Sequence, residues 1–157
     1  MEAYYLWIKL AHVLGAVVIL GTGIGTAFQM LAAHRSRNVP GIALVARNVV
    51  KADWLFTTPA VILQPLTGTL LAVILGYSLA DRWLLGSVLL YALAGAAWLP
   101  VVVLQLRMRD LAVRAAAANE PLPPAYFRLF RWWFALGWPG FGAVLVIFHL
   151  MVAKPDF

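Results

Sequence analysis

The chain has 157 residues, of which 64% are hydrophobic and 11% are charged, and its formal net charge is +6. A soluble domain of this size could not bury so much apolar surface, and the mean hydropathy is +0.88. We therefore expect one membrane domain over residues 1–157. Cysteine is absent, which excludes disulfides, iron–sulfur clusters and thiolate-bound or covalently attached haem. A basic balance is ordinary for an inner-membrane protein and does not indicate nucleic acid as a partner.

Four apolar runs are long enough to cross a bilayer, which takes ~20 apolar residues. They cover about 4–33, 54–77, 83–106 and 132–153. These runs predict an all-α fold, a four-transmembrane-helix bundle that passes up-down-up-down through the membrane. Because no cationic segment precedes the first run, we expect it to be a retained span and not a cleaved signal peptide.

The connections between the spans also have helical patterns. Residues 41–53 are expected to be helical and to run into the second span, and the alanine-rich residues 107–118 are expected to extend the third helix. The proline-rich segment 121–124 should then stop that helix. Within the second span, Pro59 and Pro65 should kink the helix and free backbone carbonyls, which Gln64 and neighbouring threonines can satisfy.

The distribution of cations predicts the orientation. Nine of the 12 lysines and arginines lie in or beside the first and third connections. These nine are Arg35, Arg37, Arg47, Lys51, Arg107, Arg109, Arg114, Arg128 and Arg131. The excess places both connections in the cytoplasm and both termini on the outer side of a bacterial inner membrane. Asp53, at the cytoplasmic mouth of the second span, is expected to pair with Lys51, Arg47 or Arg128.

Two histidines lie inside the spans, His12 in the first and His149 in the last. Ionisable side chains in lipid are costly and indicate function by default, although a hydrogen bond to a neighbouring helix would also account for each. Both lie at similar depth near the outer face, and the first and fourth helices of such a bundle are neighbours. Two facing imidazoles are the ligands of a b-type haem iron, which predicts a haem protein for electron transfer or oxidation.

Other residues extend this interpretation. Lys9 shares a helix face with His12 and could neutralise a haem propionate, although it could equally reach the headgroups. Arg82 and Lys154 are candidates for the same role. Gly15, with Gly21 and Gly25, could make room for the cofactor, while the GxxxG spacing of the last two also fits helix packing or a homodimer. His34, beside two arginines, is expected to be interfacial only.

The chain resembles the HemJ-type protoporphyrinogen IX oxidases, which are small haem-binding bacterial membrane proteins. The matching residues are Tyr5, Trp7, Lys9 and His12, then His34, Arg47, Thr57-Thr58-Pro59, Trp83-Leu84 and the series Arg128, Pro139, Lys154-Pro155. The resemblance implies a helical membrane bundle with His12 at the haem-ligand position. It also implies a relative of these oxidases in a four-helix membrane family.

The chain departs from that pattern at three places. Ser87 stands where the family has a lysine, Leu136-Gly137-Trp138-Pro139 replaces an asparagine–glutamate–x–proline element, and His149 has no counterpart. These departures leave three functions open: a bis-histidine haem protein, a HemJ-like oxidase, or a small non-redox transporter or assembly subunit. A redox partner protein or a porphyrin- or quinone-like small molecule is the expected partner in the first two cases.

Overall fold

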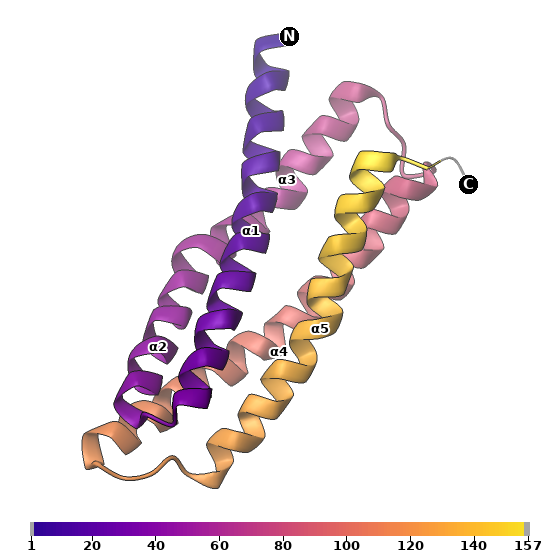
Figure 1. The fold of residues 1–157 in the computed structure, drawn as a ribbon. Coiled ribbons are helices and arrows are strands. Elements are labelled where there is room, and N and C mark those ends of the chain that lie inside the picture. The colour runs from indigo at the N-terminus through magenta and orange to yellow at the C-terminus, as the bar shows by residue number, and fades with distance from the viewer. Residues whose placement is uncertain (1, 156–157) are drawn as a thin grey trace.

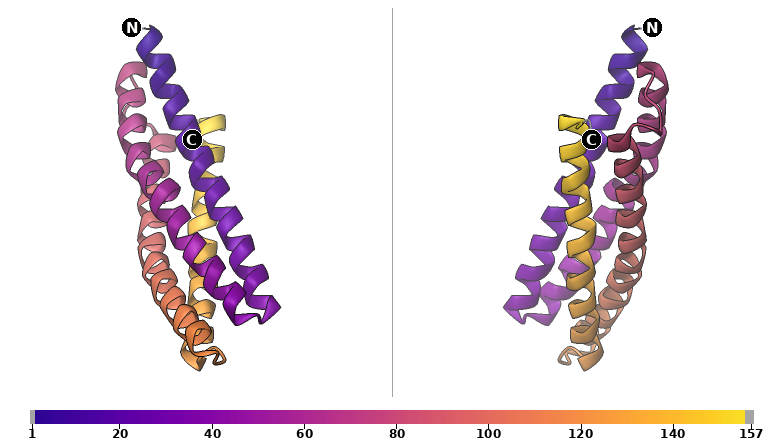
Figure 2. Two further views of the ribbon diagram at one scale, coloured as in Figure 1. Left: turned by 90° about the vertical axis from the view of Figure 1, so that its left-hand side faces the viewer. Right: turned by 90° about the vertical axis from the view of Figure 1, so that its right-hand side faces the viewer.

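The computed structural model describes residues 2–155, and these residues form helices and short connections without a strand. The helices are α1 (Glu2–Ser36), α2 (Val39–Ala52), η1 (Asp53–Thr57), α3 (Thr58–Leu75), α4 (Arg82–Ala118) and α5 (Pro124–Ala153). Four helical runs are long and apolar enough to cross a membrane, namely Tyr4–Ser36, Val39–Leu75, Arg82–Ala118 and Pro124–Ala153. The all-α, four-helix membrane class predicted from the sequence is confirmed. α1 begins and α5 ends at the same end of the bundle (Figure 2).

The second run is one continuous helix, with the π-helical turn η1 between α2 and α3. It begins where the side chain of Asn38 accepts a hydrogen bond from the backbone N–H of Gly41, and it ends at Gly76, whose φ of 71° lies in the left-handed region. The expected helix over 41–53 is present as α2 and runs directly into η1. Figure 1 shows that the run changes direction between α2 and α3. Pro59 lies just after this turn, as the predicted kink requires.

The third helix extends well beyond the predicted span, as its alanine-rich continuation indicated. α4 reaches Ala118 and ends at Asn119, whose φ of 55° is left-handed. The proline-rich segment then separates α4 from α5, which begins at Pro124. Pro100 and Pro139 lie inside α4 and α5 without ending either helix.

The helices associate as two pairs, α1 with α3 and α4 with α5. α2 packs against both α4 and α1 and so joins the pairs at the end of the bundle opposite the termini (Figure 1). The largest buried cluster lies at this end and includes Ile42 and Val49 of α2, Met108 of α4, and Tyr126 and Phe130 of α5. The expectation that α1 and α5 are close neighbours is wrong over most of their length, because they touch only over a short stretch.

Little of the apolar surface of the spans is buried inside the chain. In an 18-residue apolar stretch of each run, the share of residues that are buried is 0%, 6%, 11% and 6%, in chain order. Large side chains such as Trp7, Phe28 and Val73 are exposed along them. In a bilayer these side chains contact lipid, which does not penalise their exposure.

Candidate functional site

His12 is held in one orientation by the helix on which α1 packs. Its Nδ1 lies 2.9 Å from the hydroxyl oxygen of Thr67 on α3. That hydroxyl lies 2.8 Å from the carbonyl oxygen of Leu63 and donates its single hydrogen there. With the Thr67 hydroxyl bonded to the carbonyl of Leu63, the His12 tautomer that fits is the one that carries its N–H on Nδ1 and donates to Thr67. In this tautomer the lone pair on Nε2 is available to a ligand, and the backbone of Gln64 also lies within hydrogen-bonding reach of the ring.

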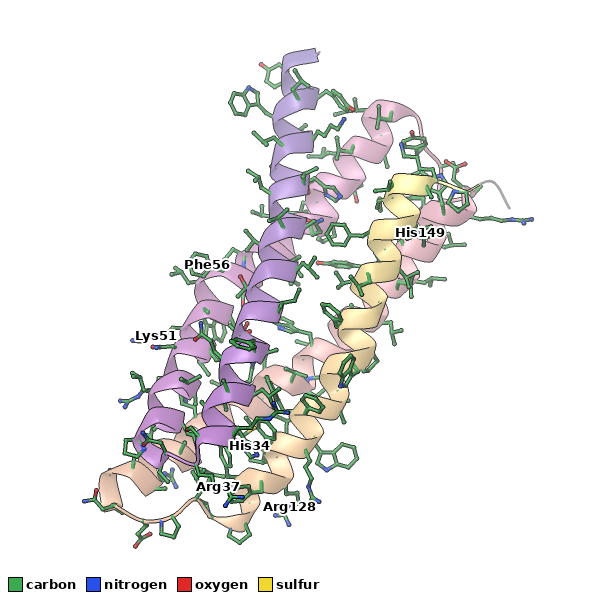
Figure 3. The ribbon with its side chains drawn as sticks, in the orientation of Figure 1. His34, Arg37, Lys51, Phe56, Arg128 and His149 are labelled. Carbon is green, nitrogen blue, oxygen red and sulfur yellow. The ribbon has the colours of Figure 1, made fainter. Side chains whose placement is uncertain are left out.

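His149 lies near the end of α5, as Figure 3 shows, and its side chain is exposed. Among the described side chains, neither a hydrogen bond nor a ring contact joins His149 to His12. His12 faces α3, and α5 packs chiefly on α4. The structure therefore does not bring the two predicted ligands together within one chain.

Glycines allow α1 and α3 to approach closely around His12. A Cβ atom at Gly68 would lie 3.2 Å from Cε1 of His12, and a Cβ atom at Gly15 would lie 2.6 Å from Oε1 of Gln64. The end of the Gln64 side chain thus occupies the space beside Gly15, and the expectation that this glycine makes room for a cofactor stays a prediction. The space beside Gly21 and Gly25 contains no heavy atom of the described chain within 4 Å.

The three candidate cations have separate surroundings. The ammonium group of Lys154 donates to the hydroxyl of Tyr77 at 2.7 Å and lies over the rings of Tyr77 and Trp83, 4.7 and 5.5 Å from their centroids. It therefore ties the end of α5 to the turn between α3 and α4. Lys9 lies 5.5 Å from the ring centroid of Tyr5 on its own helix. Arg82 is exposed at the first residue of α4.

A cavity of about 440 Å³ lies between the two helix pairs. Its wall combines residues of α1, α4 and α5 with Asp53, Thr57 and Val61 of the second run. Most of the wall is apolar, and the polar side chains in it include Asp53, Thr57, Tyr91 and Gln105. The volume lies within the range of about 300–1,000 Å³ that is usual for small-molecule sites.

The π-helical turn places Asp53 in the wall of this cavity. The backbone N–H of Thr58 bonds to the carbonyl of Asp53, which is the i to i+5 bond of a π-helix. Asp53 and Thr57, one wide turn apart, are both buried, and the hydroxyl of Thr57 donates to Oδ1 of Asp53 at 2.9 Å. The residues between them are exposed, as Figure 3 shows for Phe56 at the bend. Such turns recur at functional sites in helical proteins.

The expectation that Asp53 pairs with a cation is wrong. No lysine or arginine among residues 2–155 forms an ion pair with Asp53. The one salt bridge among these residues joins Arg109 to Asp110. Lys51 is exposed two residues earlier, on the outer side of α2 (Figure 3). The other carboxyl oxygen of Asp53, Oδ2, is buried without a short hydrogen bond to a described residue, and the side chain of Gln105 lies within hydrogen-bonding reach of the carboxyl.

The backbone carbonyl of Val61, beside the cavity, accepts a hydrogen bond from a side chain of another helix. Pro65 lacks an N–H, so the carbonyl of Val61, four residues earlier, cannot make its helical bond. The hydroxyl of Tyr91 on α4 donates to that carbonyl. The sequence predicted that freed carbonyls would need donors, but it pointed to Gln64 and the threonines and missed Tyr91.

His34 is more than an interfacial residue. Its ring lies parallel to that of Phe130 at a centroid distance of 3.7 Å and an interplanar angle of 6°, and it also stacks on Tyr126 at 5.9 Å. These contacts join the end of α1 to the start of α5. Nδ1 of His34 and the hydroxyl of Tyr126 are both buried without a partner among the described residues. A histidine beside arginines carried no sequence signal for this packing.

These features define a polytopic helical membrane protein with polar side chains inside its spans. The chain belongs to the family described as predicted integral membrane protein (DUF2269), which it matches over residues 6–155. Neither a curated protein nor a solved structure matches it.

Proposed function

We propose that this protein binds a b-type haem, with His12 as an iron ligand, and serves in electron transfer or oxidation. The observation that carries the proposal is the 2.9 Å hydrogen bond between Nδ1 of His12 and the hydroxyl of Thr67, which orients the ring and, with the N–H on Nδ1, leaves Nε2 for iron. Histidines that bind metals commonly donate their other ring N–H in this way, which fixes the tautomer and the ring plane. Bound haem iron would supply one-electron redox chemistry.

The remaining expected contacts have weaker support. His149 is exposed, so it is available as a second ligand to a haem held against its own chain or shared with a second copy. Lys9 is exposed on the helix that carries His12 and is the cation best placed to meet a propionate. Lys154 already contacts two aromatic rings and is less available.

The absorption spectrum of the full chain, purified from haem-replete cells, tests this proposal. We expect a Soret band and sharp α and β bands on reduction. The band should be lost in His12→Ala and kept in His34→Ala, because His34 packs on Phe130 at the opposite end of α1. A colourless wild-type protein, or a His12→Ala variant with full haem content, would overturn the proposal.

Two further variants refine it. Thr67→Val removes the acceptor of the His12 N–H while keeping the shape of the side chain, and it should weaken haem binding roughly 10–100-fold. Thr69→Val, at an exposed position two residues later, is the matched control. Loss of haem in His12→Ala together with full retention in His149→Ala would favour a single protein ligand, as the resemblance to HemJ-type oxidases implies, over the bis-histidine arrangement.

A further inference from the structure

The cavity between the helix pairs contains a carboxyl group with an unused hydrogen-bonding capacity. Asp53 is 6% exposed, and its Oδ2 has no partner among the described residues. An ionised carboxylate buried without a cation is costly, which favours the neutral acid. The hydroxyl of Thr57 already donates to Oδ1. The neutral acid would carry its proton on Oδ2, which makes no short hydrogen bond to a described residue.

A second polar group lies beside this carboxyl. The side chain of Gln105, which is also 6% exposed, lies next to Asp53 and lines the same cavity. Its amide group offers two N–H donors. One N–H of Gln105 can bond to Asp53, and the other remains for a ligand, so the polar part of the cavity offers donors from two helices. A ligand with an acceptor such as a carbonyl oxygen would satisfy them.

The rest of the wall fits a flat apolar ring. Trp98 of α4 and Trp133, Phe134, Trp138 and Phe141 of α5 all line the cavity. Aromatic side chains pack favourably against flat rings by offset stacking and edge contacts. Their concentration on α4 and α5 gives the cavity one strongly aromatic side.

The cavity is also open to the lipid. α1 and α5 touch over a short stretch only, and the described parts of α3 and α4 do not pack closely against each other. A ligand can therefore enter sideways from the bilayer, which requires a lipid-soluble molecule. Its apolar tail would remain between the helices or in the lipid.

We propose that this cavity binds a lipid-soluble quinone, with a ring carbonyl that accepts a hydrogen bond from the carboxyl group of Asp53. Gln105 donates to the same end of the ring, and the aromatic residues of α4 and α5 contact its faces. The site is separate from His12, which does not line the cavity, so the proposal holds with or without haem.

Decylubiquinone, titrated into the detergent-solubilised full chain, tests this site through quenching of tryptophan fluorescence. We expect saturable quenching, since three tryptophans line the cavity. Affinity should fall at least tenfold in Asp53→Leu, which removes the donor, and stay within a few-fold in Asp53→Asn, whose amide can still donate.

A glycine pair supplies the variants that leave the carboxyl intact. A Cβ atom at Gly95 or at Gly21 would meet nothing within 4 Å, but Gly95 lines the cavity and Gly21 does not. Gly95→Leu should therefore fill the cavity and lower the affinity at least tenfold. Gly21→Leu, the matched control, should bind decylubiquinone as the wild type does.

Three outcomes would overturn the proposal: equal affinity in Gly95→Leu and Gly21→Leu, competition by decanol as strong as that by decylubiquinone, or binding of dodecylamine in place of the quinone. The last would mean that Asp53 is ionised and takes a cation. Quinone binding that persists in His12→Ala separates this site from the haem proposal, because the Soret band reports only the latter.

Discussion

The hydroxyl of Thr57 donates a hydrogen bond to the carboxyl of Asp53 across 2.9 Å, one turn of π-helix earlier in the chain. Both side chains are buried in a bundle whose spans otherwise expose mostly apolar residues to lipid. Thr57→Val keeps the size of the side chain and removes the donor. Leaving a buried carboxyl oxygen unsatisfied should lower the free energy of unfolding by about 1–3 kcal/mol.

Unfolding in detergent, followed by circular dichroism, measures this loss. Thr58→Val is the control, since the hydroxyl of Thr58 makes no hydrogen bond to a described residue. Equal stability of the two variants would mean that the bond between Thr57 and Asp53 does not stabilise the turn.

The bond from Tyr91 to the carbonyl of Val61 should depend on Pro65. Tyr91→Phe leaves that carbonyl without a donor and should cost about 1–3 kcal/mol. In a Pro65→Ala background the new backbone N–H can bond to Val61, so Tyr91→Phe should then cost less than about 0.5 kcal/mol. The double-mutant cycle, measured by unfolding in detergent, is the test. Additive effects would show that Tyr91 does not compensate for the proline.

Lys154 should hold the end of α5 against the turn that joins α3 to α4. Lys154→Met removes its hydrogen bond to Tyr77 and its contacts with two rings, of which each cation–π contact at an exposed site is worth about 0.5–1 kcal/mol. Hydrogen exchange of the amides in the last turn of α5 should become several-fold faster. Lys51→Met, on α2 and away from the end of α5 (Figure 3), should leave this exchange unchanged.

Gly68 should be required for the position of the His12 ring. In Gly68→Ala the new Cβ would lie 3.2 Å from Cε1 of His12, so the ring must shift or α1 must move away from α3. We expect a lower thermal midpoint and, if haem is bound, a lower haem content per chain. Gly142→Ala is the control because its Cβ would meet nothing within 4 Å. Wild-type behaviour of Gly68→Ala would argue against a fixed His12 ring.

The sequence predicted the helices well because their positions depend on properties of neighbouring residues along the chain. Apolar runs of bilayer length define the spans, and the alanine-rich segment after residue 106 could only continue α4. Gly76, Asn119 and the prolines before α5 then end or begin helices through their own backbone preferences. The sequence also indicated that His12 needs a partner, since an imidazole in an apolar span is costly without one, and Thr67 supplies it.

The tertiary structure alone decided which helices pair and what each polar side chain contacts. Lipid is as apolar as a protein core, so a membrane span carries no polar stripe that reveals which of its faces packs on a neighbour. His12 therefore faces Thr67 of α3 and not His149 of α5. Likewise, Asp53 lies inside the cavity wall and not beside a cation, because the π-helical turn rotates it inward while Lys51 remains outside.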